Sequence, residues 1–534
     1  MLKTPSQTCS TCGSQLDYGT LFKPGPGPCK LMEGGPCALC LELEEFDREC
    51  QAILVSLTKR RRGILQRINQ RHDPFIQHLP LELASKVFVF CLPQHVFNSN
   101  PVNISLFLDA SKFSNITPFN IVLGSFCQSW RRIAWSTPDL WSTLPIRLHR
   151  WYEPTRVDLT LKWLSRFAQI PLDVAVAYGH RSIAPEVYME DNLDVWKPLI
   201  DIVNGCSNRW RTFIVDVPDF VLPYIVGNGE PTSILKCLKV GPDFSFERPS
   251  IGFSLTNSLP MPSELVLSAM PLRSIDIGWS NLTIVGINDF YVNECLVLLR
   301  WAPRLVTFAI NGLRPGQDKI LLAPATTTHS TLERLDIFGI GEKQTAQQLL
   351  DLLILPSLVD LSYDSRPNPL ENVSAFLQRS CCRLTVLRVI NRDHDHFSKM
   401  APASGLQALE NLEYHGYLDD CLHCLNRATN GGDGSIFFPS LRRLAIWDEP
   451  KNWSGLADLF LSRPLKTLSI HPVLNTNPMH KNTWVDKETA LRFQDLVEKG
   501  HNIKIMVHSM GNREARDLLP WFIEFRRSEN RMVD

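Results

Sequence analysis

Four cysteines near the amino terminus have a spacing that matches a known kind of chemical site. Cys9 and Cys12 form one Cys-x-x-Cys pair, and Cys37 and Cys40 form a second. Two such pairs could supply four thiolates to a tetrahedral zinc ion. The residues between the pairs lack the strand pattern of a zinc ribbon, and short motifs often match by chance. We therefore favour free cysteines in a tail over a zinc site.

Two other groups contain side chains that can bind metals. One is the run His394-Asp395-His396, and the other is Cys421-x-x-Cys424 with His423 between the thiols. Both fall outside the strand pattern described below, where polar loops and half-buried helices are commoner than metal sites. No nucleophile elbow, kinase motif set or zincin motif occurs in the sequence. We expect no metal, no cofactor and no enzymatic activity.

The composition is that of a folded protein with more than one structural part. The chain has 534 residues, of which 44% are hydrophobic and 21% charged, and its formal net charge is zero. A neutral balance argues against nucleic acid as the partner. The start MLKTPSQTCS lacks an apolar signal region, and no run of eighteen apolar residues occurs, so we expect no membrane partner. Fifteen scattered cysteines favour reduced thiols, and so a cytoplasmic or nuclear location.

Residues 1–40 are rich in Pro and Gly, which predicts a mostly disordered tail. From 41 to 72 the pattern is helical, with apolar residues at the first and fourth positions of a seven-residue repeat. These are Leu43, Phe46, Cys50, Ile53, Leu57 and Ile64. Arg60 and Arg67 take later fourth positions, and Gly63 interrupts the repeat. Docking on the next domain and weak self-association as a short coiled coil both remain open.

Charge is unevenly distributed along this predicted helix. Acidic residues crowd its start and basic residues its end, an order that complements the helix dipole. The run Lys59-Arg60-Arg61-Arg62 could serve as a nuclear import signal. The basic end of a charged helix produces such a run without any function, and we favour that interpretation.

Residues 73–145 contain three pieces rich in large apolar side chains. The first is LPLELASKVF, from Leu79, followed by CLP; the second is FCQSWRRIA, from Phe126; the third is STPDLWSTL, from Ser136. Their order and spacing closely resemble the F-box, in the form frequent in large protein families of mushroom-type fungi. A long segment between Pro93 and Phe126 is the one departure from the shortest F-boxes.

The resemblance implies a three-helix module that docks on a Skp-type adaptor of a cullin ubiquitin ligase. A module this small cannot bury all its aromatic side chains, and an unburied cluster marks a partner surface. The alternative for Trp130 and Trp141 is simple packing beneath the following domain. The residues that the resemblance assigns to adaptor binding are Leu79, Pro80, Leu81, Leu83, Val87, Phe88, Trp130 and Trp141.

After residue 145 a pattern of the form apolar-x-x-apolar-x-apolar returns at intervals of about 24–37 residues. The copies are LKCLKV (235–240), LRSIDI (272–277), LVTFAI (305–310), LERLDI (332–337), LVDLSY (358–363), LTVLRV (384–389), LENLEY (409–414), LRRLAI (441–446) and LKTLSI (465–470). Each copy predicts a strand with one buried face, and helix-compatible runs lie between them. This pattern predicts an irregular leucine-rich-repeat solenoid.

The consensus Asn of that repeat is missing in most copies, for example at Ser280 and Ile340, so we expect no side-chain ladder after the strands. Charged residues that flank the buried pair of each copy are predicted to face a protein substrate. These are Arg334, Asp336, Asp360, Arg388, Glu413 and Arg443. Their mixed sign indicates no ligand class.

The expected fold is therefore mixed α and β: an N-terminal helix and a three-helix F-box, followed by an irregular α/β leucine-rich-repeat solenoid. The predicted parts are a Cys-containing tail (1–40), the helix (41–72), the F-box (73–145), a connecting segment or first irregular repeat (146–205), the solenoid (206–480) and a C-terminal cap (481–534). The expected function is substrate recognition for a Skp-cullin-F-box ubiquitin ligase. The alternative is a non-catalytic repeat scaffold that never joins a ligase.

Overall fold

The structure is a computed structural model that describes most of the chain. The described residues are 7–8, 15–16, 38–72, 79–92, 119–148, 154–166, 169–178, 193–232, 234–242, 252–316, 326–339, 345–364, 371–391, 404–416, 421–422, 425, 438–447, 453–462, 465–471, 485, 487–507, 516–517, 519–520 and 524. The chain divides into two compact units. We call them the helical unit (Met1–Cys91 and Asn120–Thr137) and the sheet unit (Leu92–Phe119 and Pro138–Asp534).

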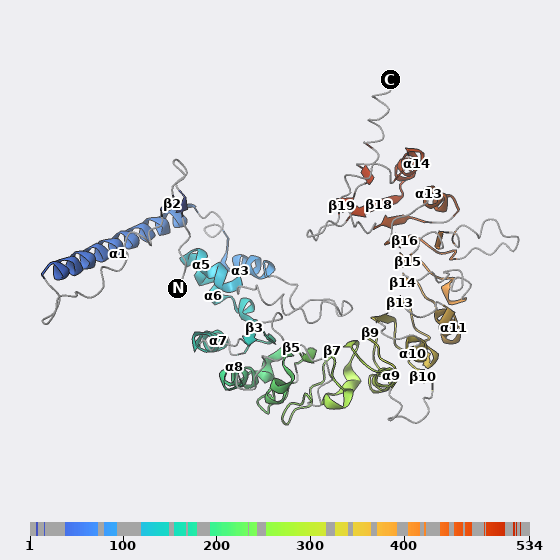
Figure 1. The fold of residues 1–534 in the computed structure, drawn as a ribbon, viewed down its shortest axis with the longest axis horizontal. Helices are drawn as coiled ribbons and strands as arrows, with labels where there is room; N and C mark the ends of the chain where they lie inside the picture. Colours follow the sequence, from blue (N-terminus) through green and yellow to red (C-terminus); the bar gives the residue numbers. More distant parts are fainter. Residues whose placement is uncertain are drawn as a thin grey trace, which may run out of the picture. The chain divides into compact units, whose positions relative to one another are not determined.

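The helical unit contains one long helix and several short ones (Figure 1). They are α1 (Ala38–His72), α3 (Leu81–Phe90), α5 (Phe119–Phe126) and α6 (Gln128–Ser136). Helix α1 confirms the helix predicted over 41–72 and begins three residues earlier. Within the predicted tail, Gln7–Thr8 (β1) and Gln15–Leu16 (β2) pair as antiparallel strands, which the composition did not predict.

Helices α3 and α6 pack through aromatic and hydroxyl contacts. The Phe88 and Trp130 rings have centroids 5.0 Å apart, and Thr137 Oγ1 is hydrogen-bonded to Ser85 Oγ at 2.8 Å. The thiol of Cys127 caps α6 by accepting a hydrogen bond from the backbone N–H of Trp130 at 3.4 Å. A side-chain cap satisfies one of the amides that a helix start leaves unpaired, so Cys127 has a structural role.

The sheet unit is a mixed α/β structure built on one 15-stranded sheet. From β3 to β18 all neighbouring strands are parallel and follow one another in chain order, and β19 pairs antiparallel with β18. A separate pair, β10 (Thr327–Thr328) with β12 (Leu353–Ile354), is also parallel. The strands of the large sheet are β3 (Thr143–Leu148), β4 (Leu172–Tyr178), β5 (Trp210–Val217), β6 (Cys237–Pro242), β7 (Glu264–Ser268), β8 (Ile284–Asn288), β9 (Thr307–Asn311), β11 (Arg334–Phe338), β13 (Asp360–Asp364), β14 (Val386–Asn391), β15 (Asn411–Gly416), β16 (Arg443–Ile446), β17 (Thr467–Ile470), β18 (Asn502–Val507) and β19 (Arg516–Asp517).

Helices of the sheet unit connect many of these strands. They are α7 (Pro154–Arg166), α8 (Leu193–Gly205), α9 (Val292–Trp301), α10 (Thr345–Asp351), α11 (Glu371–Ser380), α13 (Trp453–Ser462) and α14 (Lys487–Glu498). Figure 1 shows α9, α10 and α11 on the same side of their strands. On β14, Leu387 and Val389 are fully buried, whereas Arg388 between them is only half-buried. Because successive side chains of a strand alternate in direction, one face carries the apolar core and the other carries polar groups.

The repeating apolar pattern located eight of the fifteen strands of the large sheet. The copies at 235–240 and 305–310, and every later copy, overlap a strand of the large sheet. The strand predicted from the copy at 272–277 was wrong, because Leu272–Ser274 is a 3-10 turn and Ile275 makes only an isolated bridge. Its apolar residues are nevertheless buried, since the spacing reports burial rather than strand pairing. The sheet uses β7 and β8 on either side of it instead.

The two ends of the large sheet extend beyond the predicted solenoid (206–480). The predicted boundary at residue 145 falls inside β3, and both β3 and β4 belong to the large sheet. Of the two interpretations of residues 146–205, this excludes a mere connection and leaves a first irregular repeat as the prediction. Within the predicted C-terminal cap, Arg516 and Asp517 pair antiparallel with β18 as a further strand of the sheet. Over the described residues, no helix is both long enough and apolar enough to cross a membrane.

A short side-chain ladder does follow three strands, contrary to expectation. Asn311 Nδ2 donates to Asn288 Oδ1 at 2.7 Å, and Asn288 Nδ2 donates to Ser268 Oγ at 3.0 Å. Each residue is the last of its strand, β9, β8 and β7. The sequence pattern missed this ladder because these residues come directly after the last apolar residue rather than three positions later. The ladder pairs side-chain polar groups where the chain leaves the sheet.

Candidate functional site

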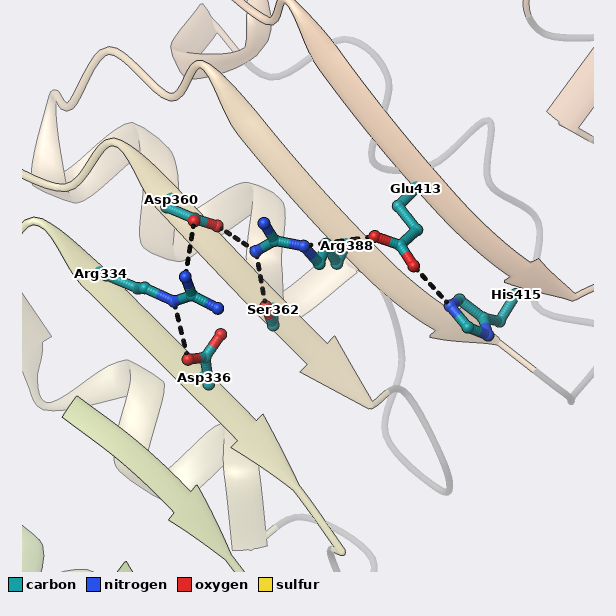
Figure 2. Close-up of polar contacts among 7 residues, drawn as sticks. All are labelled: Arg334, Asp336, Asp360, Ser362, Arg388, Glu413 and His415. Carbon is teal, nitrogen blue, oxygen red and sulfur yellow. Dashed lines mark hydrogen bonds and ion pairs between the residues drawn. The ribbon is translucent and has the colours of Figure 1, made fainter. Parts of the chain in front are cut away.

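Polar side chains form a continuous row across one face of strands β11, β13, β14 and β15. The register places Arg334 beside Asp360, Asp336 beside Ser362, and Arg388 beside Glu413. Ser362 also lies beside Arg388 in the register. Neighbouring strands are about 4.8 Å apart, so long side chains at matched positions can reach one another. We call this set the charged row: Arg334, Asp336, Asp360, Ser362, Arg388, Glu413 and His415 (Figure 2).

Arg334 holds the first part of the charged row. Its Nε donates to Asp336 Oδ2 at 2.9 Å on the same strand, and its Nη1 lies 3.5 Å from Asp360 Oδ2 on the next strand. The Asp336 side chain is fully buried, whereas that of Arg334 is about a quarter exposed, at 26%. The guanidinium therefore shields one carboxylate and links it to the next strand.

Arg388 joins the middle of the charged row. Its Nη1 donates to Asp360 Oδ1 at 2.6 Å and to Ser362 Oγ at 3.3 Å, and its Nε lies 3.3 Å from Glu413 Oε2. Acidic and basic groups thus alternate from β11 to β15, with an arginine between successive carboxylates (Figure 2). Like charges at directly opposite positions would be destabilising, and this order avoids them.

The charged row ends in a stack of aromatic rings. His415 Nε2 lies 3.2 Å from Glu413 Oε1. The His415 ring stacks on Trp447, with centroids 4.9 Å apart, and Trp447 stacks on His471, with centroids 4.0 Å apart. The three rings come from successive segments of the sheet unit: His415 from β15, Trp447 from the position after β16 and His471 from the position after β17. The three rings are half-buried and lie next to a hydrogen-bonded carboxylate.

The two ends of the charged row have opposite effects on carboxylate acidity. The hydrogen bond with His415 lowers the pKa of Glu413, and its effect exceeds that of burial. Burial raises the pKa of Asp336, and the Ser362 hydroxyl and Arg334 only partly oppose that rise. Charge is therefore stabilised at Glu413 and disfavoured at Asp336, since desolvation penalises an ionised carboxylate.

The structure brings most of the predicted substrate-facing residues together on this face. Arg334, Asp360, Arg388 and Glu413 form the ion pairs described above. Arg443 on β16 is exposed and makes no ion pair with any part of the chain that the structure describes. The buried position of Asp336 corrects its assignment, because a fully buried carboxylate cannot make direct contact with a substrate.

Three members of this surface were missed from the sequence. Ser362 and His415 each lie two residues beyond a predicted residue, Asp360 and Glu413, and so occupy the same strand face. Trp447 follows directly after β16. Counting in steps of two along each apolar pattern could have located all three positions, but not their contacts.

The adaptor-binding prediction centres on α3, which has two apolar faces. Ala84 and Phe88 point inward and are buried. Leu83, Val87 and Phe90 are spaced four and three residues apart, so they lie along one outward stripe. They are 46%, 36% and 78% exposed. We call them the α3 stripe, and Phe90 is the member that the sequence interpretation missed.

The other residues assigned to adaptor binding differ in accessibility. Leu81 and Pro80 are exposed, while Leu79 and Trp130 are half-buried. The assignments of Phe88 and Trp141 need correction, because only 2% and 5% of their surfaces are exposed. Phe88 packs on Trp130.

Trp141 belongs to the sheet unit, where its ring centroid lies 5.0 Å from that of Trp163. The alternative interpretation of Trp141, packing within the following domain, is what the structure has.

No group of three or more metal-ligating side chains lies close together in the described parts of the chain. Cys9, Cys12, Cys37, the run 394–396, His423 and Cys424 lie outside the described residues, as does the side chain of Cys40. Neither the models of known protein families nor the curated proteins include a match to this sequence.

Proposed function

We propose that this chain is a substrate-recognition subunit of a Skp-cullin-F-box type ubiquitin ligase. In this proposal the α3 region is an F-box that docks on the adaptor, and the sheet unit is an irregular leucine-rich-repeat solenoid that holds a protein substrate. The chain itself breaks no bonds. It raises the effective concentration of substrate lysines near the charged ubiquitin carrier.

The α3 stripe is the observation that carries the proposal. Three large apolar side chains, Leu83, Val87 and Phe90, stand exposed on one face of a helix whose other face is packed. Exposed apolar patches of this kind mark protein interaction sites. The stripe lies within the segment whose sequence resembles the F-box, which specifies a Skp-type adaptor as its partner.

The sheet unit supports the second part of the proposal. Its parallel strands follow chain order, each next to its sequence neighbours, as in an array of repeats. Arg443 is exposed and has no ion pair among the described residues. The stacked rings of His415, Trp447 and His471 come from β15 and from the positions directly after β16 and β17. We place first contact with a substrate there, because the arginines of the charged row are already paired with carboxylates.

The test is co-purification of the full chain with a fungal Skp-type adaptor by size-exclusion chromatography. A co-eluting complex is expected. Leu83→Asp and Phe90→Asp each should abolish it, since a charge in an apolar interface leaves a buried, unpaired group. Leu159→Asp on α7 is the matched control, because Leu159 is also an exposed leucine, at 48%.

Absence of a complex with a folded wild-type chain would overturn the proposal. It would also be overturned if Leu83→Asp and Phe90→Asp bind the adaptor as tightly as Leu159→Asp does. The chain would then be the repeat scaffold that forms no part of a ligase, and the face around Arg443 would remain its interaction surface.

A further inference from the structure

Helix α1 leaves an apolar seam uncovered. The helix is 35 residues long, and Leu43, Phe46, Ile53, Leu57 and Ile64 are all between 40% and 60% exposed. Together with Cys50 and Arg60, they occupy positions at alternating intervals of three and four residues, the spacing by which two helices pack side chains into each other. A helix with such a seam is stable in water chiefly when a second surface covers it.

The contact between α1 and the rest of the helical unit leaves that seam free. Gln66 Nε2 donates to Gln128 Oε1 at 2.8 Å, which joins α1 to α6. Gln66 is two residues beyond Ile64 and lies away from the seam positions in the seven-residue repeat. Docking on α6 therefore does not bury the seam.

The order of charge on α1 specifies what can cover the seam. Residues 42–49 carry five acidic side chains and one basic one, whereas residues 59–71 carry six basic side chains and no acidic one. A second α1 in parallel would set acid on acid and base on base. An antiparallel second copy sets each acidic half against a basic half, and such pairs determine the orientation of paired helices.

One antiparallel register satisfies both the apolar and the charged side chains. It sets Ile53 opposite Leu57 of the second copy at the centre, and Phe46 opposite Ile64 of the second copy toward each end. In an antiparallel pair, a residue at the first position of the seven-residue repeat lies opposite a residue at the fourth position of the partner helix. This register follows that rule.

The same register explains why arginines interrupt the seam. Arg60 and Arg67 then reach Glu49 and Glu42 of the second copy, and Arg61 lies opposite Asp47 of the second copy. Each match occurs twice by the two-fold symmetry of the pair. A polar residue at a seam position selects one register and one orientation over others.

We propose that two copies of this chain associate through α1 in an antiparallel pair with this register. The pairing uses a different helix from the adaptor surface and does not depend on the proposed function. It presents two copies of the sheet unit in one assembly.

The test is sedimentation equilibrium of the full chain over a range of concentrations. The wild-type chain is expected to show a reversible monomer–dimer equilibrium. Asp47→Lys and Arg61→Glu each turn two attractive pairs into repulsive ones and should weaken the dimer roughly tenfold. The double variant restores opposite charges and should return the dissociation constant to near its wild-type value.

The matched control reverses the same kinds of charge on the outward side of α1. Glu45→Lys and Arg62→Glu occupy positions that face away from the seam, and each should leave the dimer unchanged. Far-UV circular dichroism of every variant checks that α1 remains helical.

Mild oxidation separates the two orientations. A parallel pair sets Cys50 directly beside Cys50 of the second copy, whereas the antiparallel register sets it opposite Arg60, so no Cys50–Cys50 disulfide is expected by mass spectrometry. The proposal is overturned by a monomer at all concentrations, by a dimer insensitive to Asp47→Lys and Arg61→Glu, or by rapid formation of that disulfide.

Discussion

Arg388 on β14 donates a hydrogen bond of 2.6 Å from its Nη1 to Asp360 Oδ1 on β13. The two residues are 28 positions apart in the chain, and only the parallel register of the sheet brings them together. Arg388 also lies 3.3 Å from Glu413, so one guanidinium separates two carboxylates. Every carboxylate of the charged row thus has an arginine beside it.

Loss of Arg388 should therefore destabilise the sheet unit more than loss of an unpaired arginine. Arg388→Met leaves Asp360 and Glu413 partly buried without their shared partner, which should lower the free energy of unfolding by about 1–3 kcal/mol. Urea unfolding followed by circular dichroism measures it. Arg443→Met is the control, with an expected change within about 0.5 kcal/mol. Equal losses in the two variants would contradict the role given to Arg388.

Glu413 should make stability depend on pH in the acid range. Its pKa is lowered in the folded chain, chiefly by the hydrogen bond with His415. The ionised Glu413 therefore contributes to the free energy of unfolding at neutral pH, and this contribution is lost as pH falls through the lowered folded-state pKa. Glu413→Gln should lower stability at neutral pH and reduce the loss of stability on acidification. Thermal unfolding across this pH range, with Glu410→Gln as control, tests it; an unchanged acid slope would refute the assignment.

Asp336 should make stability depend on pH in the opposite direction. Burial raises its pKa, so the folded chain holds the proton more tightly than the unfolded chain. Stability must then fall as pH rises from the unfolded-state pKa to the folded-state pKa. Asp336→Asn removes this fall and should be at least as stable as the wild type at neutral pH, with the difference vanishing in acid. A clear loss of stability at neutral pH would mean that the attraction of Arg334 outweighs the cost of burial.

The ladder of Ser268, Asn288 and Asn311 should contribute more to the free energy of unfolding than an exposed amide hydrogen bond does. Asn288→Ala removes both side-chain hydrogen bonds and leaves Asn311 Nδ2 without its acceptor, at a cost of about 1–3 kcal/mol. Asn281→Ala removes one exposed hydrogen bond to Met261 and should cost less than about 1 kcal/mol. Chemical denaturation compares the two. Similar costs would show that the ladder stabilises the chain no more than one exposed hydrogen bond does.

Much of the sheet could be predicted because its apolar residues follow a local rule. Leu387 and Val389 are both buried, and their spacing of two residues is visible in the printed sequence. The same rule failed at Leu272 and Ile275, which are buried without forming a strand of the sheet. Apolar spacing indicates which side chains are buried. A 3-10 turn can bury its apolar side chains as a strand does, so the spacing alone does not distinguish the two.

The contacts of the charged row could not be predicted, because they depend on register. Arg334, Asp360, Arg388 and Glu413 were all recognised as flanking apolar pairs, yet no local pattern indicates which acid meets which base. His415 gained its role only through Glu413 beside it and Trp447 on a later segment.

By itself, the sequence determined the long charged helix, eight strands of the large sheet and the apolar character of α3, since each depends on periodicity within a few residues. The tertiary structure decided that Phe88 and Trp141 are buried, that Phe90 is exposed and that Asp336 is enclosed. Burial of a single side chain depends on residues far away in the chain, whose positions are set by packing and strand register rather than by local pattern.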